Sequence, residues 1–369
     1  MKTKENSDLI FDPGTLRNFM FDMFRHCGVP GEDSELAADV LAYSDEHGID
    51  SHGIARLKTY YDLLKAGRIN PDPKIRVIRG KKSVSCVDGD NGLGLVVGPK
   101  CMEMAIEKAQ VHGSGWIAVC NTNHYGAAGY YPLLAIPHDL IGLSMTNTSK
   151  GVVPFNGIEK MLGTNPIAMA FPADKEAPLL VDFASSTVAY GKVEIAKRRG
   201  EQVPDGWCID GNGMSTNDPA IMMAEGALLP LGSSKEGSGH KGYCIAAMVD
   251  ILTAVLSGAN WGPFGPAFAI KAEQDSREVG KGIGHFFGAW EIDGFRDIQA
   301  FKTNMDDWIK TMRATPHLAG NEKVMVPGDP EIKAYRERMV HGIPLNQEVV
   351  KEMESISKET GIPMPIGKG

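Results

Sequence analysis

Two residues that could perform acid–base chemistry lie four positions apart near the start of the chain, His52 and Arg56. The spacing predicts that, in a helix capped by Ser51, both side chains lie on one face of the first two turns. A guanidinium can hold a carboxylate through two parallel hydrogen bonds while an imidazole exchanges a proton. The pair therefore favours an enzyme for small acids with a carbonyl or hydroxyl beside a carboxylate. Two ordinary polar residues at a solvated helix end would give the same pattern.

Three other histidines lie at positions typical of either a catalytic or a structural role. His124 follows an expected strand and precedes glycines, a place where α/β enzymes often present catalytic groups. His47 and His112 lie at expected helix ends, where a histidine complements the helix dipole, and we interpret both as structural.

The run Gly237-Ser238-Gly239-His240-Lys241-Gly242 matches the dinucleotide fingerprint G-x-G-x-x-G, but a polar loop precedes it where the fingerprint requires a strand. Glycines and Lys241 before an apolar helix could hold a phosphate, or the run could be a surface loop. At no other position does the fingerprint occur in the right context, so a standard Rossmann domain is not expected. Metal chemistry is a rival class, yet His47, Asp50 and His52 lack the spacing of a helical zinc site. A third alternative is a binding protein that holds a carboxylate without turnover.

Composition narrows the class of partner. The chain has 369 residues, of which 43% are apolar and 23% charged, as in an ordinary globular protein. Its formal net charge of −8 argues against nucleic acid or an anionic membrane as the main partner, because either would require a basic face. Its six cysteines have no C-x-x-C spacing and are expected to be reduced thiols. Residues 1–6 carry no apolar run, so we expect no secretory signal and a cytoplasmic location. The stretch 243–256 is too short for a membrane span and is expected to form a buried core helix.

Periodicity divides the chain into helical and β-rich regions. Apolar residues at helical spacing over 16–27, 36–44 and 54–64 predict three helices that each end near a glycine. Helical signals return near the end of the chain, at 306–312, 330–341 and 346–358. Between these regions two helices are expected, at 99–112 and 188–199, together with strands at 84–87, 116–120, 140–145, 167–171 and 179–183.

Strict βαβ alternation is absent, so the expected fold is α/β with a largely mixed or antiparallel sheet. We expect a helical domain formed by residues 1–75 and 300–369, and a sheet domain formed by 76–299.

Several strings, in this order, resemble the type-2 malate/L-lactate dehydrogenase family, which also includes sulfolactate, ureidoglycolate and diketogulonate oxidoreductases. The strings are Ser51-His52-Gly53 with Arg56, Asn123-His124-Tyr125-Gly126, Gly163-Thr164-Asn165-Pro166-Ile167-Ala168, Val181-Asp182-Phe183-Ala184, Tyr190-Gly191-Lys192 and His240-Lys241-Gly242-Tyr243. The resemblance extends to about residue 345. It implies an NAD- or NADP-dependent interconversion of 2-hydroxy and 2-oxo acids, with malate or lactate as leading substrates, by a homodimer in which both subunits contribute to each site. It also implies that the helical domain binds substrate and forms the dimer, and that the sheet domain is a non-Rossmann cofactor domain that binds NAD(P). A reductase of a cyclic imine acid or a sugar-derived keto acid is the alternative within the family, and a metal-dependent enzyme is a more distant one.

The resemblance also implies roles for individual residues. His52 is similar to the family's proton donor, His124 to the proton acceptor of the ureidoglycolate branch, and Asp182 to a residue that orients a catalytic group or touches the nicotinamide. Arg56 is similar to a ligand of the substrate carboxylate, and Thr164 and Asn165 are expected beside it. The residues expected to hold the dinucleotide are Thr148, Asp182, Phe183, Ala184, Ser185, Ser186, Thr187, Lys192, His240, Lys241, Gly328 and Asp329. The loop 232–239 is longer than in the diketogulonate and ureidoglycolate branches, so phosphate contacts there are expected to be redistributed. Lys197, Arg198 and Arg199 could meet the 2′-phosphate of NADP or face water.

Overall fold

The computed structural model describes residues 8–270, 277, 279–320 and 322–368. The expectation about residues 1–6 therefore lies outside the described residues. None of the helices in the described ranges has the length and apolar character needed to cross a membrane.

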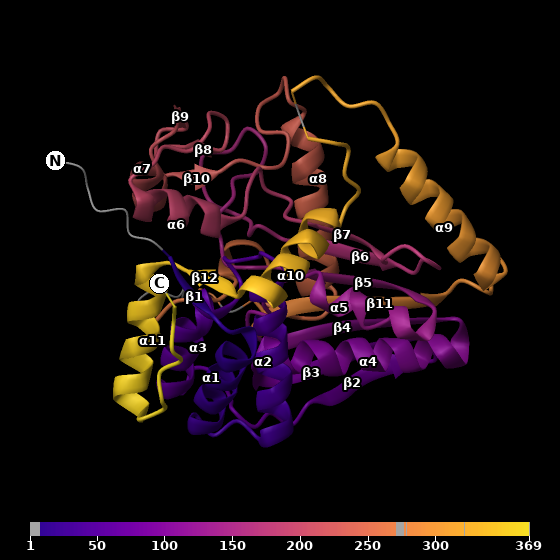
Figure 1. Ribbon diagram of the computed structural model, residues 1–369, viewed down its shortest axis with the longest axis horizontal. Helices are drawn as coiled ribbons and strands as arrows, with labels where there is room; N and C mark the ends of the chain where they lie inside the picture. Colours follow the sequence, from indigo (N-terminus) through magenta and orange to yellow (C-terminus); the bar gives the residue numbers. More distant parts are fainter. Residues whose placement is uncertain (1–7, 271–276, 278, 321, 369) are drawn as a thin grey trace.

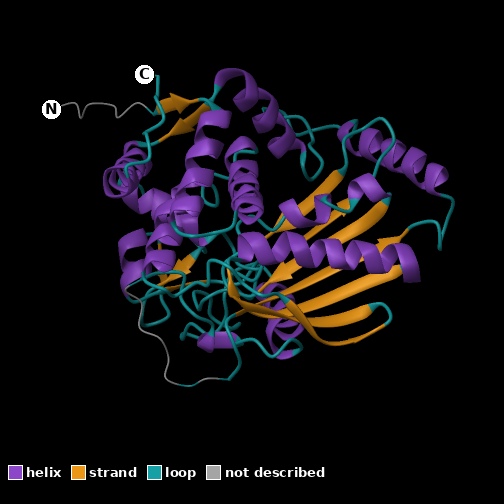
Figure 2. Ribbon diagram, turned by 90° about the horizontal axis from the view of Figure 1, so that it is seen from below, coloured by secondary structure: helices purple, strands orange, loops and turns teal. Residues whose placement is uncertain are grey.

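A seven-stranded mixed sheet forms the centre of the molecule (Figure 2). Its strands, in spatial order, are β2 (Arg76–Lys81), β3 (Val84–Gly92), β4 (Ser114–Thr122), β11 (Ile283–Glu291), β5 (Leu140–Thr146), β6 (Ile167–Phe171) and β7 (Leu179–Phe183). Only β3 and β4 pair in parallel, and the other neighbours are antiparallel. The expectation of a largely mixed or antiparallel sheet is confirmed.

Helices cover both faces of this sheet, as the alternation of side chains along β11 requires. Phe287 belongs to the main core, which α4 (Gly94–His112) covers on one face. Its neighbour Phe286 points to the other face, where α8 (Gly239–Asp250) and the π-helix Ile251–Val255 pack. The sheet therefore separates two layers of helix.

The two ends of the chain meet beside the sheet (Figure 1). Strand β1 (Leu9–Phe11) pairs antiparallel with β12 (Ile343–Leu345). The helices of this region are α1 (Pro13–His26), α2 (Gly31–Glu46), α3 (Leu57–Lys65), α10 (Asp329–His341) and α11 (Gln347–Thr360). Side-chain caps set two of their starts: Asp12 accepts from the Thr15 amide, and Asn346 accepts from the amides of residues 348 and 349. Helix α9 (Ile298–Arg313) instead packs by Ile309 against β7, so it lies along the sheet edge.

A smaller unit stands next to β7. It contains a three-stranded sheet, β8 (Cys208–Ile209), β9 (Ser215–Thr216) and β10 (Ala227–Leu228), which was not predicted because its strands are only two residues long. Helices α6 (Tyr190–Arg199) and α7 (Pro219–Ala224) pack with it around a separate apolar cluster that includes Val193 and Met222. A short helix, α5 (Tyr130–Leu133), follows the segment that carries His124.

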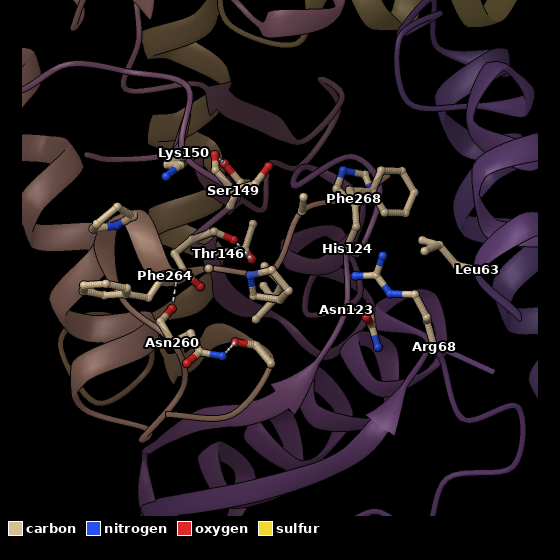
Figure 3. A pocket seen from close by; sticks show the side chains of 18 of the residues that line it. Leu63, Arg68, Asn123, His124, Thr146, Ser149, Lys150, Asn260, Phe264 and Phe268 are labelled. Atoms are coloured by element: carbon tan, nitrogen blue, oxygen red, sulfur yellow. Dashed lines mark hydrogen bonds between the residues drawn. The ribbon is translucent and has the colours of Figure 1, made fainter. Parts of the chain in front are cut away.

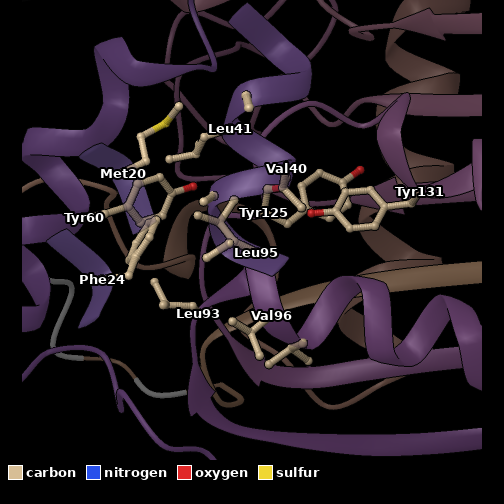
Figure 4. Packing of buried hydrophobic residues seen from close by; sticks show 14 of the residues in the cluster. Met20, Phe24, Val40, Leu41, Tyr60, Leu93, Leu95, Val96, Tyr125 and Tyr131 are labelled. Atoms are coloured by element: carbon tan, nitrogen blue, oxygen red, sulfur yellow. The ribbon is translucent and has the colours of Figure 1, made fainter. Parts of the chain in front are cut away.

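The main core joins the N-terminal helices to the sheet without interruption. Met20, Phe24 and Tyr60 from the helical region pack in one cluster with Leu95 of α4 and with Tyr125 (Figure 4). Tyr60 and Tyr125 are among the largest fully buried side chains. Burying aromatic groups of this size holds the segments that carry the candidate residues in fixed positions.

Three expectations about helices were wrong in detail. Ser51 does not cap a helix: residues 54–56 form a 3-10 turn, and α3 begins at Leu57. Helix α4 begins at Gly94 rather than Pro99, because a glycine there lets the helix approach the backbone carbonyls of residues 123 and 124, where a Cβ would lie 2.2 Å from the first. The segment 243–256 is not fully buried, since Met248, Ile251 and Val255 are 43%, 54% and 54% exposed.

Candidate active site

A buried carboxyl group holds the turn that carries His52. Asp45, at the end of α2, accepts a hydrogen bond from the Ile54 amide at 2.8 Å. Residue 53 must be glycine, because a Cβ there would lie 1.9 Å from Asp45 Oδ1. Arg338 of α10 donates to the Asp45 carbonyl and to the Asp50 carboxylate, which ties the other end of the turn to the C-terminal region. The position of His52 thus depends on contacts from two distant segments.

His52 is held as a neutral imidazole. Burial, with a further contribution from the positive charge of Arg56, lowers the pKa of His52 to about 4. Its Nδ1 lies 2.8 Å from Ser51 Oγ. A hydroxyl can donate to or accept from a ring nitrogen, so this contact permits either tautomer of His52. The ring can therefore take up or release a proton without breaking its support.

His124 has a fixed tautomer. Its Nδ1 accepts a hydrogen bond from the Gly126 amide at 3.3 Å, and an amide can only donate. Tyr60 Oη lies 2.7 Å from the same nitrogen and so acts as a second donor, which leaves the proton of the neutral ring on Nε2. Burial, His52 and Arg56 together hold the pKa of His124 well below its usual range. His124 is therefore a neutral hydrogen-bond donor.

The two histidines stand together between two cavities. Their rings lie 5.7 Å apart, centroid to centroid, and are nearly parallel at 19°. His52 lines a cavity of about 630 Å³, and His124 lines a second one of about 720 Å³ (Figure 3). The two cavities also adjoin at a second point, because the amide of Thr164, which lines the His52 cavity, donates at 3.0 Å to Oγ1 of Thr148, which lines the His124 cavity. The histidine pair can therefore act on a molecule that reaches in from either side.

Arg56 is engaged by the protein itself. Its Nη2 pairs with Glu194 of α6 at 2.8 Å, and its Nε donates to the Ser51 carbonyl at 2.7 Å. Neither cavity has Arg56 in its wall. Arg56 is thus near enough to His52 for its charge to lower the pKa of His52, but the two do not share the helix face expected from their spacing, and part of the guanidinium is occupied.

Asp182 lines the His52 cavity at the end of β7. Its Oδ2 accepts from the Gly129 amide at 2.7 Å, which ties the strand to the segment after His124. Desolvation raises the pKa of Asp182 to about 6, although part of the side chain is exposed in the cavity. With this pKa most of the carboxyl group is ionised at neutral pH, so it chiefly accepts hydrogen bonds.

The other expected site residues divide into two groups. One group lines a cavity: Thr148 the His124 cavity, and Thr164, Phe183, Ala184, Lys192 and Gly328 the His52 cavity. The other group supports the walls through bonds to the backbone. Asn165 bonds the Ala246 carbonyl and the Thr148 amide, while the hydroxyls of Ser185, Ser186 and Thr187 donate to the carbonyls of residues 164, 188 and 207. Asp329 forms a two-point ion pair with Arg313.

His240 and Lys241 lie apart from both cavities, on the exposed first turn of α8. The loop before them is tightly packed backbone to backbone. A Cβ on Gly239 would lie 2.0 Å from the Ser233 carbonyl oxygen, and one on Gly237 would lie 2.2 Å from that of Gly232. The glycines of this fingerprint-like run are thus required by the fold of the loop.

Sequence reasoning missed the partners of the histidines and of Arg56. Tyr60 could have been found, since it continues the four-residue spacing of His52 and Arg56. Glu194 gave no signal, because it lies 138 positions from Arg56. The buried His285, whose Nδ1 bonds Thr146 Oγ1 at 2.8 Å and whose Nε2 has no partner among the described residues, is equally remote in sequence.

The buried carboxyl of Asp45 predicts a pH dependence of stability. Burial raises the pKa of Asp45 to about 8, so the folded protein keeps a proton that the unfolded chain releases. Stability is therefore expected to fall as pH rises from about 4 to 8, by at most about 1.4 kcal/mol per pH unit from this group. Asp45→Asn keeps an acceptor for the Ile54 amide and cannot ionise. In urea unfolding, D45N is expected to lose less free energy of unfolding than wild type between about pH 4 and 8. The exposed control Asp293→Asn is expected to lose as much as wild type. Equal slopes in D45N and wild type would contradict this.

Within the described ranges, no group of three or more His, Cys, Asp or Glu side chains is arranged to hold a metal ion. The site chemistry that the geometry does support is proton exchange at His52, hydrogen-bond donation by His124 and binding of small molecules in the two adjoining cavities.

Comparison with known proteins identifies the family of this chain. A family model described as malate/L-lactate dehydrogenase matches residues 11–354. The malate dehydrogenase of Pyrococcus horikoshii is 40% identical over 94% of this chain and 94% of its own length, and the L-sulfolactate dehydrogenase of Methanocaldococcus jannaschii is 36% identical over 96% and 98%. The crystal structure of malate dehydrogenase from Entamoeba histolytica superposes with a TM-score of 0.90 at 33% identity, covering 97% of this chain and 100% of that one. The chain therefore belongs to the malate/L-lactate dehydrogenase family and is a hydroxy-acid dehydrogenase.

Proposed function

We propose that the protein interconverts a malate- or lactate-like 2-hydroxy acid and its 2-oxo acid, with NAD or NADP as the hydride carrier and His52 as the proton carrier. The observation that carries the proposal is the pair of neutral histidines between two cavities, one ring of fixed tautomer and one free to exchange its proton. A dehydrogenase of this type needs both a hydrogen-bond donor to the substrate oxygen and a proton carrier.

The residues around the His52 cavity fit a nicotinamide dinucleotide. The N-terminus of α6 opens on this cavity through Ala189 and Lys192, with no acidic residue in its first turn, which suits a diphosphate. Apolar groups such as Phe183 and Ala184 offer a surface for a planar ring. We infer that Asp182 and Thr148 stand near the reactive end, because Asp182 lines the same cavity as His52 and Thr148 the same cavity as His124. When bound, the cofactor supplies or accepts the hydride.

His52 is suited to proton exchange in both directions. In the oxidation of a hydroxy acid, its neutral ring is ready to accept the hydroxyl proton. In the reduction of an oxo acid it must be protonated first, and a bound carboxylate would favour the charged form by raising the low pKa of His52. Ser51 supports the ring in either form, and Nε2–H of His124 can donate to the substrate oxygen.

Lys241 is proposed to contact the cofactor phosphates in the assembled enzyme. A lysine at the first turn of a helix attracts anions, so Lys241→Ala is expected to raise the dissociation constant for NAD(P)H. Fluorescence titration measures that constant, and Lys351→Ala, on the exposed surface of α11, is the matched control. An unchanged dissociation constant in K241A would show that the loop 232–242 connects two elements without contacting the cofactor.

We propose a homodimer and a cytoplasmic location. The exposed apolar residues Met248, Ile251 and Val255 form a stripe on α8 and the π-helix, which a second copy would cover. Lys241 and His240 begin the same helix, so such a dimer would bring them toward a partner subunit. Sedimentation equilibrium measures the assembly directly. All six cysteines are free thiols, in keeping with a reducing compartment.

The experiment that tests the proposal is a panel of oxo acids assayed with NADH and with NADPH. The panel contains oxaloacetate, pyruvate, a cyclic imine acid and a sugar-derived keto acid. Oxidation of the cofactor by oxaloacetate or pyruvate is the expected result, and the rates with the two cofactors decide between NAD and NADP. Turnover of the cyclic imine alone would favour the reductase alternative, and loss of activity on chelation would favour a metal enzyme. Binding of oxo acids without any cofactor oxidation would contradict the proposal.

A further inference from the structure

The cavity beyond His124 has an unusually cationic wall for a chain of net charge −8. Four of its lining residues carry positive charge, namely Arg68, Lys150, Lys160 and Arg277. Among the residues that the structure describes, none that lines it is Asp or Glu. Its other polar groups include amides that bond to the scaffold: Asn147 to the Asn260 carbonyl and the Gly284 amide, and Asn123 to the backbone of residues 91 and 92. Of the described residues in this wall, Lys150 and Lys160 are therefore cations that a ligand in this cavity would meet.

Lys150 and Lys160 form a pair within this wall. A short antiparallel bridge between Val152 and Leu162 connects the segments that carry them, through bonds from Gly151 to the Leu162 carbonyl at 2.8 Å and from Met161 to the Val152 carbonyl at 3.0 Å. Burial, with a further contribution from the charge of Lys150, lowers the pKa of Lys160. No carboxylate of the described residues pairs with either ammonium group. Two like charges held together without a counter-charge favour an anion between them.

The pair shares its cavity with the catalytic end. Figure 3 shows Lys150 and Ser149 on one side, His124 and Phe268 on the other, and Thr146 between them. A molecule whose oxygen meets His124 could therefore extend a second group toward the lysines. A monocarboxylate such as lactate has only a methyl group to extend, whereas a dianionic acid has a carboxylate or sulfonate.

We propose that Lys150 and Lys160 form a subsite for a second anionic group of the substrate, so that the enzyme prefers dianionic 2-hydroxy and 2-oxo acids to monocarboxylates. This inference rests on the proposed function, since it assumes that the reacting carbon lies beside His124. A phosphate of the cofactor offers the same chemistry, and the experiment separates the two sources.

The test compares wild type with the double variant Lys150→Gln/Lys160→Gln on oxaloacetate and on pyruvate, with Lys351→Gln as the matched surface control. Glutamine keeps a polar end and nearly the same length but removes the charge. The double variant is expected to lose about tenfold to a hundredfold in kcat/KM for oxaloacetate, the value of hydrogen bonds to a charged group, with little change for pyruvate. The dissociation constants of NADH and NADPH, from fluorescence titration, are expected to stay the same.

Two results would overturn the subsite. Weaker binding of NADH or NADPH, with an equal loss on both acids, would assign the lysines to a cofactor phosphate. Unchanged kinetics on both acids would show that the lysines only face solvent. A wild-type enzyme that oxidises no cofactor with any acid would instead contradict the proposed function, so the two failures are distinguishable.

Discussion

Replacing His52 with alanine is expected to lower kcat about 10²- to 10⁴-fold, the usual contribution of a general acid or base, while the dissociation constant for NAD(P)H changes little. The reason is that His52, with Ser51 at its Nδ1, can exchange a proton without losing support. Stopped-flow and steady-state kinetics measure the loss. His26→Ala, an exposed histidine at the end of α1, is the control. Near-normal turnover in H52A would transfer the role to His124.

The same prediction has a pH signature. Because the pKa of His52 is about 4, its ring is already neutral in the free enzyme at ordinary pH. In the oxidation of a hydroxy acid, kcat/KM is expected to be independent of the His52 ionisation above about pH 5, since the base is in its working form. In reduction the required form is protonated, so kcat/KM is expected to fall as pH rises. A pH profile for reduction that is the same in H52A and wild type would contradict proton donation by His52.

Replacing Arg56 with lysine is expected to lower kcat/KM for every 2-oxo acid by about 1.5–3 kcal/mol in transition-state free energy, with NAD(P)H affinity unchanged. A lysine cannot make the forked contact that a planar carboxylate accepts from a guanidinium. The loss is expected in KM if Arg56 binds the substrate carboxylate. A loss confined to kcat would indicate that Arg56 acts by holding the Ser51 carbonyl and hence the His52 turn.

Glu194→Gln is the informative companion variant, because it leaves Arg56 intact and removes the charge that pairs with it. If Arg56 binds substrate, releasing it from Glu194 is expected to leave KM unchanged or lower it. If Arg56 is only part of the scaffold, E194Q is expected to resemble R56K. Full activity in R56K would show that the carboxylate ligand lies elsewhere, and Arg68, which lines the His124 cavity, would be the next residue to replace.

The strands next to the site were the most predictable part of the fold. Residues 167–171 and 179–183 form β6 and β7 with the bounds expected from their apolar runs and flanking turn residues. The start of the helix after His52 was not predictable from spacing. Gly53 adopts a non-helical conformation, with φ −92° and ψ −138°, because Asp45 from α2 occupies the space beside it. That contact joins residues eight positions apart across a turn, and helical periodicity carries no information about it.

The sequence singled out residues of the candidate site but not the contacts that those residues make. Local strings singled out His52, His124 and Asp182, and the structure brings them around adjoining cavities. The hydrogen bonds of the site residues depend on partners that are remote in sequence. Tyr60 is 64 positions from His124, and Glu194 is 138 positions from Arg56. Such pairs arise from the packing of the helical region on the sheet, which no single-sequence pattern specifies.

The central claim is that hydride and proton are exchanged at the wall between the two cavities, where His52 and His124 stand. A crystal structure of the enzyme with NADH and oxamate, an unreactive analogue of a 2-oxo acid, tests it most directly. The account predicts that the nicotinamide enters from the His52 cavity and that the oxamate carbonyl lies within hydrogen-bond distance of His52 or His124. A nicotinamide bound away from both histidines would contradict it.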